Sequence, residues 1–332
     1  MKISVHASRP YNIHIERGLA AMIPHLLGIH SKSLILTDSG VPSIYAESLQ
    51  KRIPNSLIFV IPEGEKSKSS DSFLKILSFL VANHFSRKDC LISLGGGVVG
   101  DLGGFVASTY MRGIAFYNIP TTLLSMVDSS IGGKTGIDFE GYKNIVGSFY
   151  PPEAVFIDPD YLSTLDKRQF AAGFAEIVKM AATLDKDFFD EIKAGTLPIE
   201  IQIEKALRIK KKVVEEDEKE SGIRKVLNFG HTLGHAYEVC GDGRFLHGEA
   251  IAMGMLPFSS PEVREEIQNV LIQNRLPIDP SIDVARIETA IRHDKKGDGE
   301  TVDAVFCPIL GKYEIKKCSI SEILSYHKEV FQ

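Results

Sequence analysis

Residues that could do metal chemistry gather in the segment LNFGHTLGHAYE, residues 227–238. His231 and His235 are four positions apart, so in a helix both imidazoles lie on one face and can converge on one point. His247 follows closely, and Glu176 stands alone in an otherwise apolar helical run. Imidazoles and a carboxylate are the usual ligands of a catalytic zinc ion. Spacing alone nominates His231 and His235 as ligands, with His247 or Glu176 as the third.

A single histidine on a helix is more often a hydrogen-bonded core residue than a metal ligand. Here each of the three histidines stands beside a glycine, and glycine lets other backbone or a ligand approach closely. The HxxxH spacing lacks the internal glutamate of the zinc protease motif HExxH, so it does not predict peptide hydrolysis. Lys179 falls one turn after Glu176, and its apolar neighbours favour a partly buried ion pair.

A glycine-rich loop, LISLGGGVVGDLGG, occupies residues 91–104. Gly95, Gly97 and Gly100 satisfy GxGxxG between a predicted strand and a predicted helix, where backbone amides can bind a pyrophosphate. The alternative is a tight turn that packs the helix against a sheet. No acidic residue follows about twenty positions later, as a dinucleotide site would require. Asp38, at the end of an earlier strand, could instead reach a ribose hydroxyl.

Composition limits the class of protein. The chain has 332 residues and a net charge of −5, which gives no reason to expect nucleic acid or an anionic membrane as partner. The N-terminus lacks the apolar core of a signal peptide, and no apolar run approaches the length of a membrane span. The four cysteines form no CxxC pair, which is typical of reduced thiols in a cytoplasmic protein.

The first part of the chain alternates short apolar runs with amphipathic segments, which predicts parallel strands joined by helices. The predicted strands are 33–40, 57–64, 89–97 and 115–122, and the helices between them are 41–53 and 69–85, the latter with Ser69, Ser70 or Asp71 as possible cap.

After residue 160 the pattern becomes helical, in the segments 166–194, 199–220, 229–240, 247–256, 262–275 and 283–294. We therefore predict an α/β domain at 1–160 with a mostly parallel sheet, followed by an all-α domain at 161–332.

Several motifs stand in one order along the chain: GGGVVGD, YMRG, PTTLLSMVDSSIGGKTGID, KNIVGSFYPP, FAEIVK, LNFGHTLGHA and LHGEA. In this order they resemble the 3-dehydroquinate synthase family of sugar-phosphate cyclases, from about Thr37 to Lys296. The resemblance implies a homodimer whose subunit has a Rossmann-like NAD domain and a helical domain that binds metal and substrate. It places the active site between the two domains.

The resemblance also implies a divalent metal, zinc or cobalt, held by Glu176, His231 and His247. The residue matching His235 then faces the substrate, which changes the ligand pair that spacing nominated. Three protein ligands leave room for substrate oxygens, as an open catalytic site requires.

The remaining site residues are implied by the same motifs. For NAD they are Asp38, Glu65, Lys68, Gly96, Gly97, Val98, Asp101, Thr121, Thr122, Lys134, Lys143 and Thr164. For the substrate they are Asp128, Lys134, Asn144, Lys179, Lys210, Arg224, Asn228, His235 and Lys295, or its neighbour Lys296, together with Arg112 of the partner subunit.

The family reaction implied is conversion of 3-deoxy-D-arabino-heptulosonate 7-phosphate to 3-dehydroquinate and phosphate, in the shikimate pathway. It proceeds through transient oxidation by NAD, phosphate elimination, reduction, ring opening and intramolecular aldol closure. Arg224 can grip a carboxylate with two parallel bonds, which lysine does less well. With Lys179 and Lys210 it favours a carboxylated substrate over those of sister cyclases.

Two departures from the family pattern concern short segments. Ser39 stands where the family often has asparagine, although serine can still donate a hydrogen bond to a ribose. The segment MLPFSSPEVREEI is compact, and Pro257 and Pro261 interrupt its helical pattern. We infer that a helix or part of one is lost here.

Two rival functions use the same features. A metal-dependent polyol dehydrogenase would share the NAD and metal sites but would have no use for Lys134, Asn144, Arg224 and Asn228. A non-catalytic, nucleotide-sensing relative would be expected to lose its metal ligands, yet all three are present.

Overall fold

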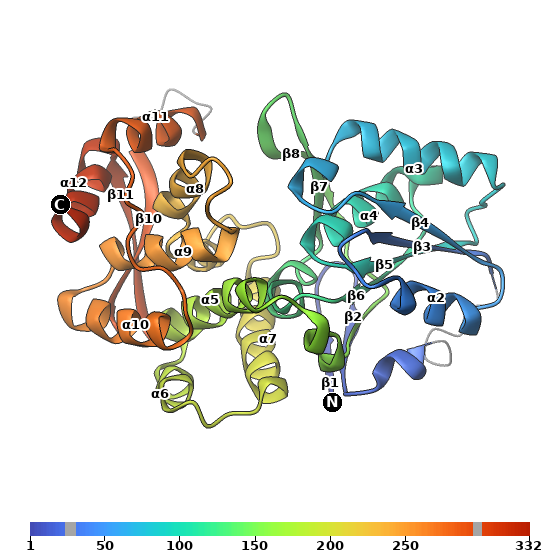
Figure 1. The fold of residues 1–332 in the computed structure, drawn as a ribbon, viewed down its shortest axis with the longest axis horizontal. Helices are drawn as coiled ribbons and strands as arrows, with labels where there is room; N and C mark the ends of the chain where they lie inside the picture. The colour runs from blue at the N-terminus through green and yellow to red at the C-terminus, as the bar shows by residue number, and fades with distance from the viewer. Residues whose placement is uncertain (24–30, 295–300) are drawn as a thin grey trace. The chain divides into compact units, whose positions relative to one another are not determined.

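The computed structural model describes residues 1–23, 31–294 and 301–332, and it consists of two compact units, Met1–Leu165 and Asp166–Gln332 (Figure 1). The division lies between Leu165 and Asp166, whereas the change of sequence pattern is near residue 160. Each unit has its own core and is described by itself.

The first unit is built on a seven-stranded sheet in the order β1-β2-β9-β6-β5-β3-β4. Its strands are β1 Lys2–Val5, β2 Tyr11–Ile15, β3 Ser33–Asp38, β4 Ser56–Ile61, β5 Cys90–Gly95, β6 Ala115–Pro120 and β9 Ala154–Ile157. All neighbouring strands are parallel except β1 and β2. The predicted mostly parallel sheet and its four predicted strands are confirmed.

Helices of the first unit pack on this sheet. They are α2 Ser43–Arg52, α3 Ser70–Ala82 and α4 Gly97–Thr109. Ser69 begins α3, because its side chain accepts a hydrogen bond from the Ser72 amide at 3.4 Å. One core lies between α3, α4 and the sheet face that carries Leu34, Leu36 and Leu91.

Short segments after the strands carry many of the predicted site residues. The 3₁₀ turn η2 Glu65–Ser67 follows β4, the π-helix η4 Ser125–Ser129 follows β6, and the 3₁₀ turn η5 Pro159–Thr164 follows β9. The 3₁₀ turn η3 Tyr110–Arg112 instead follows α4. A separate antiparallel hairpin consists of β7 Lys134–Phe139 and β8 Tyr142–Phe149 (Figure 1).

The second unit is mainly helical. Its helices are α5 Lys167–Leu184, α6 Lys186–Ala194, α7 Ile199–Glu216, α8 His231–Cys240, α9 His247–Met255, α10 Pro261–Gln273, α11 Val284–Asp294 and α12 Ile320–Phe331. Every residue of α5 from Ala171 to Thr183 is buried, so this helix is the centre of the unit. The predicted helix 166–194 is divided at Asp185, whose side chain caps α6 by accepting from the Phe188 amide.

The helical domain also contains an element that the sequence analysis missed. Strands β10 Thr301–Ile309 and β11 Lys312–Ser319 form an antiparallel hairpin, so this unit is not all-α (Figure 1). Val302 and Ala304 are buried on alternate positions of β10, which is the period of a strand with one face in the core.

The structure confirms that the helical pattern is interrupted at the two prolines after α9. Pro257 lies in a 3₁₀ turn, η7 Leu256–Phe258, and Pro261 is the first residue of α10. A proline at that position does not break a helix, because the amide it lacks has no intrahelical partner there. Ser260 caps α10 through a hydrogen bond from the Val263 amide at 3.3 Å.

Within the described ranges, we find no helix that is both long enough and apolar enough to cross a bilayer. All four cysteines carry free thiols and are buried.

Candidate active site

Three histidines of the second unit meet where two helices begin. His231 opens α8, His235 lies one turn later, and His247 opens α9. One ring nitrogen from each lies within 4.8 Å of the others. Glu176 of α5 reaches the same point, with its Oε1 at 4.0 Å from His231 Nε2 and 3.7 Å from His247 Nε2. The fold therefore brings together all four residues that the sequence analysis considered as ligands.

Hydrogen bonds at the far side of two rings orient them toward Glu176. Nδ1 of His231 lies 3.2 Å from the carbonyl oxygen of Phe229, and Nδ1 of His247 lies 3.1 Å from Oε2 of Glu238. In metal sites such partners hold the ring and leave Nε2 free for the ion. Sequence reasoning missed Glu238, although its place one turn after His235 was a usable signal.

The carboxylate of Glu176 is fully buried, and neither oxygen has a hydrogen-bond partner among the described residues. Lys179 forms an ion pair with it and is itself 1% exposed, so the predicted buried pair is confirmed. Lys179 compensates part of this charge at Oε2, but Oε1, which faces the two imidazoles, has no hydrogen bond from the described residues, and burying it is unfavourable unless a cation binds there. This environment fits a divalent metal.

The pKa values of His231 and His247 are shifted in opposite directions. Burial, with a smaller effect of the Lys179 cation, lowers the pKa of His231 well below its ordinary value. Burial alone would also lower the pKa of His247, but the hydrogen bond that its ring donates to Glu238 and the charges of Glu176 and Glu238 raise it. The neutral His231 is already in the form that binds a metal.

Glycines beside the histidines permit close approach of backbone. A Cβ on Gly230, whose φ is +79°, would lie 2.7 Å from the Ile251 carbonyl oxygen, and a Cβ on Gly234 would lie 3.1 Å from that of Ala250. At Gly248 it would overlap the carbonyl oxygen of Ala172 in α5. Of the two roles considered for these glycines, the structure thus supports helix packing.

We expect Gly248→Ala to destabilise the protein, because the added methyl group meets backbone that cannot move without shifting α5. Overpacking of this kind lowers the free energy of unfolding by about 1–3 kcal/mol, which denaturant titration measures. Gly195→Asn is the control, since nothing lies within 4 Å of an added Cβ there and asparagine tolerates its left-handed conformation. Equal stability of the two variants would contradict this packing role.

In the first unit, sheet order brings the predicted NAD residue Asp38 beside the strand that leads into the glycine loop. Asp38 ends β3 and Gly95 ends β5, and these strands are parallel neighbours. The chain leaves β3 for the edge strand β4 and returns to the other side of β3, so the order reverses at this pair. Such a switch point is where open α/β sheets bind nucleotides. Gly96 precedes α4, whose N-terminus faces the same end of the sheet.

A cavity of about 360 Å³ adjoins Asp38 in the first unit. Apolar side chains contribute to its wall, namely Val41, Pro42, Ala46, Ile58 and Val60. Asp38 itself accepts hydrogen bonds from the amides of Gly40 and Val41, which lower its pKa, but burial outweighs them and raises it.

The glycine loop serves packing as well. A Cβ on Gly96 would lie 3.2 Å from Thr122, and one on Gly97 would lie 3.2 Å from Ser129. Further along α4, a Cβ on Gly103 would overlap the side chain of Ser93 in β5. The two interpretations of this loop are compatible, because its first glycines precede the helix and its later ones face the sheet.

A buried lysine joins predicted NAD residues to a predicted substrate residue. Lys68 is 5% exposed and donates to Oδ2 of Asp101 at 2.5 Å and to Oδ1 of Asn144. Burial lowers the pKa of Lys68, but Asp101 and Glu65 outweigh this effect and raise it. The ammonium group is therefore charged and fixed in place.

The other predicted positions lie on several elements. Thr164 ends η5 and lies 2.9 Å from the Tyr45 hydroxyl. Glu65 lies in η2, Val98 in α4, Thr121 and Thr122 after β6, Asp128 in η4, Lys134 in β7, Lys143 in β8 and Lys210, which is buried, in α7. Lys295 and Lys296 lie outside the described residues.

Arg224 is buried at 3% exposure in the turn η6 Ile223–Asn228. Its Nη1 donates to the carbonyl oxygen of Glu218, and its backbone amide donates to Oδ2 of Asp217 at 3.1 Å. The backbone bond holds the turn that precedes α8, and the Nη1 bond fixes one side of the guanidinium group.

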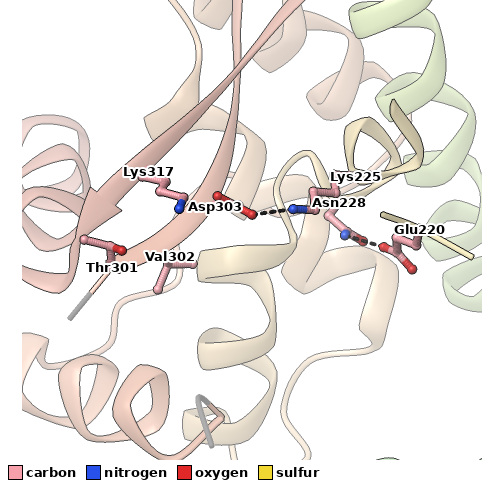
Figure 2. Close-up of a pocket in the computed structure, with 7 residues that line it drawn as sticks. All are labelled: Glu220, Lys225, Asn228, Thr301, Val302, Asp303 and Lys317. Atoms are coloured by element: carbon pink, nitrogen blue, oxygen red, sulfur yellow. Dashed lines mark hydrogen bonds and ion pairs between the residues drawn. The ribbon is translucent and has the colours of Figure 1, made fainter. Parts of the chain in front are cut away.

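Asn228 opens into a polar cavity of about 450 Å³ in the second unit (Figure 2). Its Nδ2 donates to Oε1 of Glu220 at 2.7 Å, while Lys225 pairs with Asp303 of β10 at 2.6 Å. Lys317 of β11 adds a second cation to the wall (Figure 2). Sequence reasoning missed this wall, because it depends on the hairpin that was not predicted.

Comparisons with known proteins find similar sequences over nearly the whole chain. A family model described as "3-dehydroquinate synthase N-terminal" matches residues 58–172, and one described as "3-dehydroquinate synthase C-terminal" matches 173–297. The 3-dehydroquinate synthase of Latilactobacillus sakei subsp. sakei is 39% identical over 340 residues, covering 96% of each chain. That of Streptococcus thermophilus (strain CNRZ 1066) is 40% identical over 352 residues, covering 98% of this chain and 99% of the other.

A solved structure has a fold similar to that of this chain. A crystal structure of 2-deoxy-scyllo-inosose synthase complexed with carbaglucose-6-phosphate, NAD+ and Co2+ has a TM-score of 0.89 and 25% identity, with all of both chains covered.

Proposed function

The chain belongs to the 3-dehydroquinate synthase family, and on this basis we propose how its residues convert 3-deoxy-D-arabino-heptulosonate 7-phosphate to 3-dehydroquinate and phosphate. The single observation that carries the proposal is the buried Glu176 carboxylate, faced by Nε2 of both His231 and His247. A site of this kind has no purpose in a protein that only binds nucleotides.

Glu176, His231 and His247 would hold the divalent metal, zinc or cobalt. His235 is exposed, whereas Glu176 is fully buried, and this favours a substrate-facing role for His235 over a ligand role. When bound, the metal supplies a Lewis acid that polarises a substrate oxygen, and NAD supplies a reversible hydride acceptor.

NAD would bind at the switch point of the first unit. Asp38 lies where it can accept from ribose hydroxyls, and the adjoining apolar cavity suits a flat adenine ring. The amides of Gly96, Gly97 and Val98 at the start of α4 suit a pyrophosphate. Lys68 bonds to both Asp101 and Asn144, so it fixes the position of a predicted cofactor residue relative to that of a predicted substrate residue.

The substrate carries a phosphate and a carboxylate, and each unit offers groups for it. In the second unit Lys179, Lys210 and Arg224 are buried cations, which bind anions more strongly than exposed ones do. Asn228 and His235 would orient hydroxyl groups. In the first unit the groups are Asp128, Lys134 and Asn144.

A homodimer would complete the site, with Arg112 of the partner subunit at the phosphate. One observation supports the role of Arg112, and another supports the dimer. The backbone of Met111, Arg112 and Gly113 is in the left-handed region, at φ 49°, 63° and 117°, and such strain is concentrated at functional sites. Exposed apolar side chains on the β7–β8 hairpin, including Ile145 and Phe149, are suited to contact with a second subunit. The buried free thiols accord with a reducing cytoplasm.

We expect NAD to be catalytic rather than consumed. Product should accumulate far beyond the NAD+ supplied, without a net rise in NADH absorbance, because the oxidation and the later reduction cancel. A coupled phosphate assay with simultaneous recording of NADH tests this. NADH production that matches substrate consumption would instead assign the chain to the polyol dehydrogenase reaction.

A further inference from the structure

Helix α5 presents a stripe of three residues to the start of α9. Arg168, Ala172 and Glu176 are four positions apart, so their side chains lie on one face of α5. Each contacts one residue of the short segment 247–249 at the beginning of α9. The contact between Glu176 and His247 belongs to the metal site, and the other two hold the same helices together.

The outermost contact is a two-pronged ion pair. Nε of Arg168 lies 2.6 Å from Oε1 of Glu249, and Nη2 lies 2.7 Å from Oε2. Glu249 is buried at 6% exposure, and its Oε2 also accepts from the Leu246 amide at 2.8 Å. Arg168 Nη2 donates in addition to the carbonyl oxygen of Arg244 at 2.5 Å. One guanidinium group thus fastens α5 to the first turn of α9 and to the loop before it.

The middle contact, between Gly248 and Ala172, determines the distance between α5 and α9 but not their relative orientation. Gly248 lies against the carbonyl oxygen of Ala172 so closely that no Cβ would fit. A glycine contact allows the helices to approach, yet it offers no hydrogen bond that would prevent α9 from sliding or turning. The planar Arg168 fork supplies that restraint, because two parallel bonds define an orientation.

We propose that Arg168 and Glu249 form a positioning pair, which holds His247 against Glu176 in the geometry that the metal requires. The inference rests on the proposed function, in that Glu176 and His247 are taken as ligands. Neither Arg168 nor Glu249 contacts the metal site directly. Glu249 fixes the start of α9, where His247 is the first residue, and Arg168 fixes Glu249 to the helix that carries Glu176.

The test uses cobalt(II) as a spectroscopic probe of the full-length, metal-depleted protein. Dissociation constants come from competition with a chelator, and the visible absorption bands report ligand geometry. The variants are Arg168→Met, which removes the fork, and Arg168→Lys and Glu249→Gln, which alter it mildly. Glu266→Gln is the matched control, because it breaks the exposed Lys193–Glu266 ion pair of the same unit.

We expect Arg168→Met to raise the cobalt dissociation constant roughly 10-fold, the lower end of the effect of removing a direct hydrogen-bond partner of a ligand, because the pair acts on His247 only through the start of α9, and to shift the absorption bands. Arg168→Lys and Glu249→Gln should shift both in the same direction by less, and Glu266→Gln should match the parent. Should Arg168→Met fail to fold, Arg168→Lys and Glu249→Gln decide the matter. Parent-like cobalt affinity and spectra in folded variants overturn the proposal, even where thermal stability falls. A parent protein that binds no cobalt overturns the proposed function first.

Discussion

His247→Ala is expected to abolish turnover and to lose the metal. The substitution removes the Nε2 atom that lies 3.7 Å from Glu176 Oε1, and two protein ligands do not retain a catalytic zinc ion. Metal content after gel filtration and the rate of phosphate release measure the two effects. His84→Asn, an exposed position with φ +54° that asparagine tolerates, is the control and should keep both metal and activity.

A second histidine variant separates the two ligand sets that the sequence left open. We expect His235→Ala to bind metal normally and to lose turnover, because His235 would face the substrate. Loss of metal from His235→Ala, together with normal zinc content and turnover in His247→Ala, would contradict the assignment of Glu176, His231 and His247.

Arg224→Ala is expected to lose most of its efficiency on the natural substrate and comparatively little on an analogue without the carboxylate. Removing one partner of a buried, hydrogen-bonded charge pair typically weakens binding by about 2–5 kcal/mol, or roughly 30-fold to several thousand-fold. The side chain is 3% exposed, so water cannot easily replace it. Values of kcat/KM on both substrates measure the difference.

Two further variants sharpen this prediction. Arg224→Lys should recover only part of the loss, because a point charge cannot form the fork. Arg208→Ala, at an exposed position of α7, should behave like the parent. Equal losses on both substrates would mean that Arg224 serves the turn through Glu218, or binds the phosphate, rather than reading the carboxylate.

Much of the fold could be predicted because the signals are local. Strands β3, β4, β5 and β6 are apolar runs that end at turn residues, and α3 begins at the serine expected as its cap. The hairpin β10–β11 was overlooked although its signals are local. Its strands join at a tight turn between Ile309 and Lys312, where Gly311 takes a positive φ of 78°. The break at Pro257 and Pro261 was predictable for the same reason, because proline cannot continue a helix but can begin one.

The site was predictable in part for the same reason. Helical spacing places His231 and His235 on one face, but it cannot show that Glu176 of α5 and His247 of α9 arrive at the same point. That meeting depends on glycines that let three helices touch. The resemblance to a family supplied the ligand set, whereas the Arg168–Glu249 pair emerges only from tertiary contacts.

The most direct test of the central claim is product formation from the natural substrate. Purified protein, loaded with zinc or cobalt, is incubated with 3-deoxy-D-arabino-heptulosonate 7-phosphate and a small amount of NAD+, and phosphate and 3-dehydroquinate are both quantified. We predict that the two products appear in equal amounts, only when metal is present, and far in excess of NAD+. Absence of 3-dehydroquinate from protein that holds both metal and NAD+ would contradict the account.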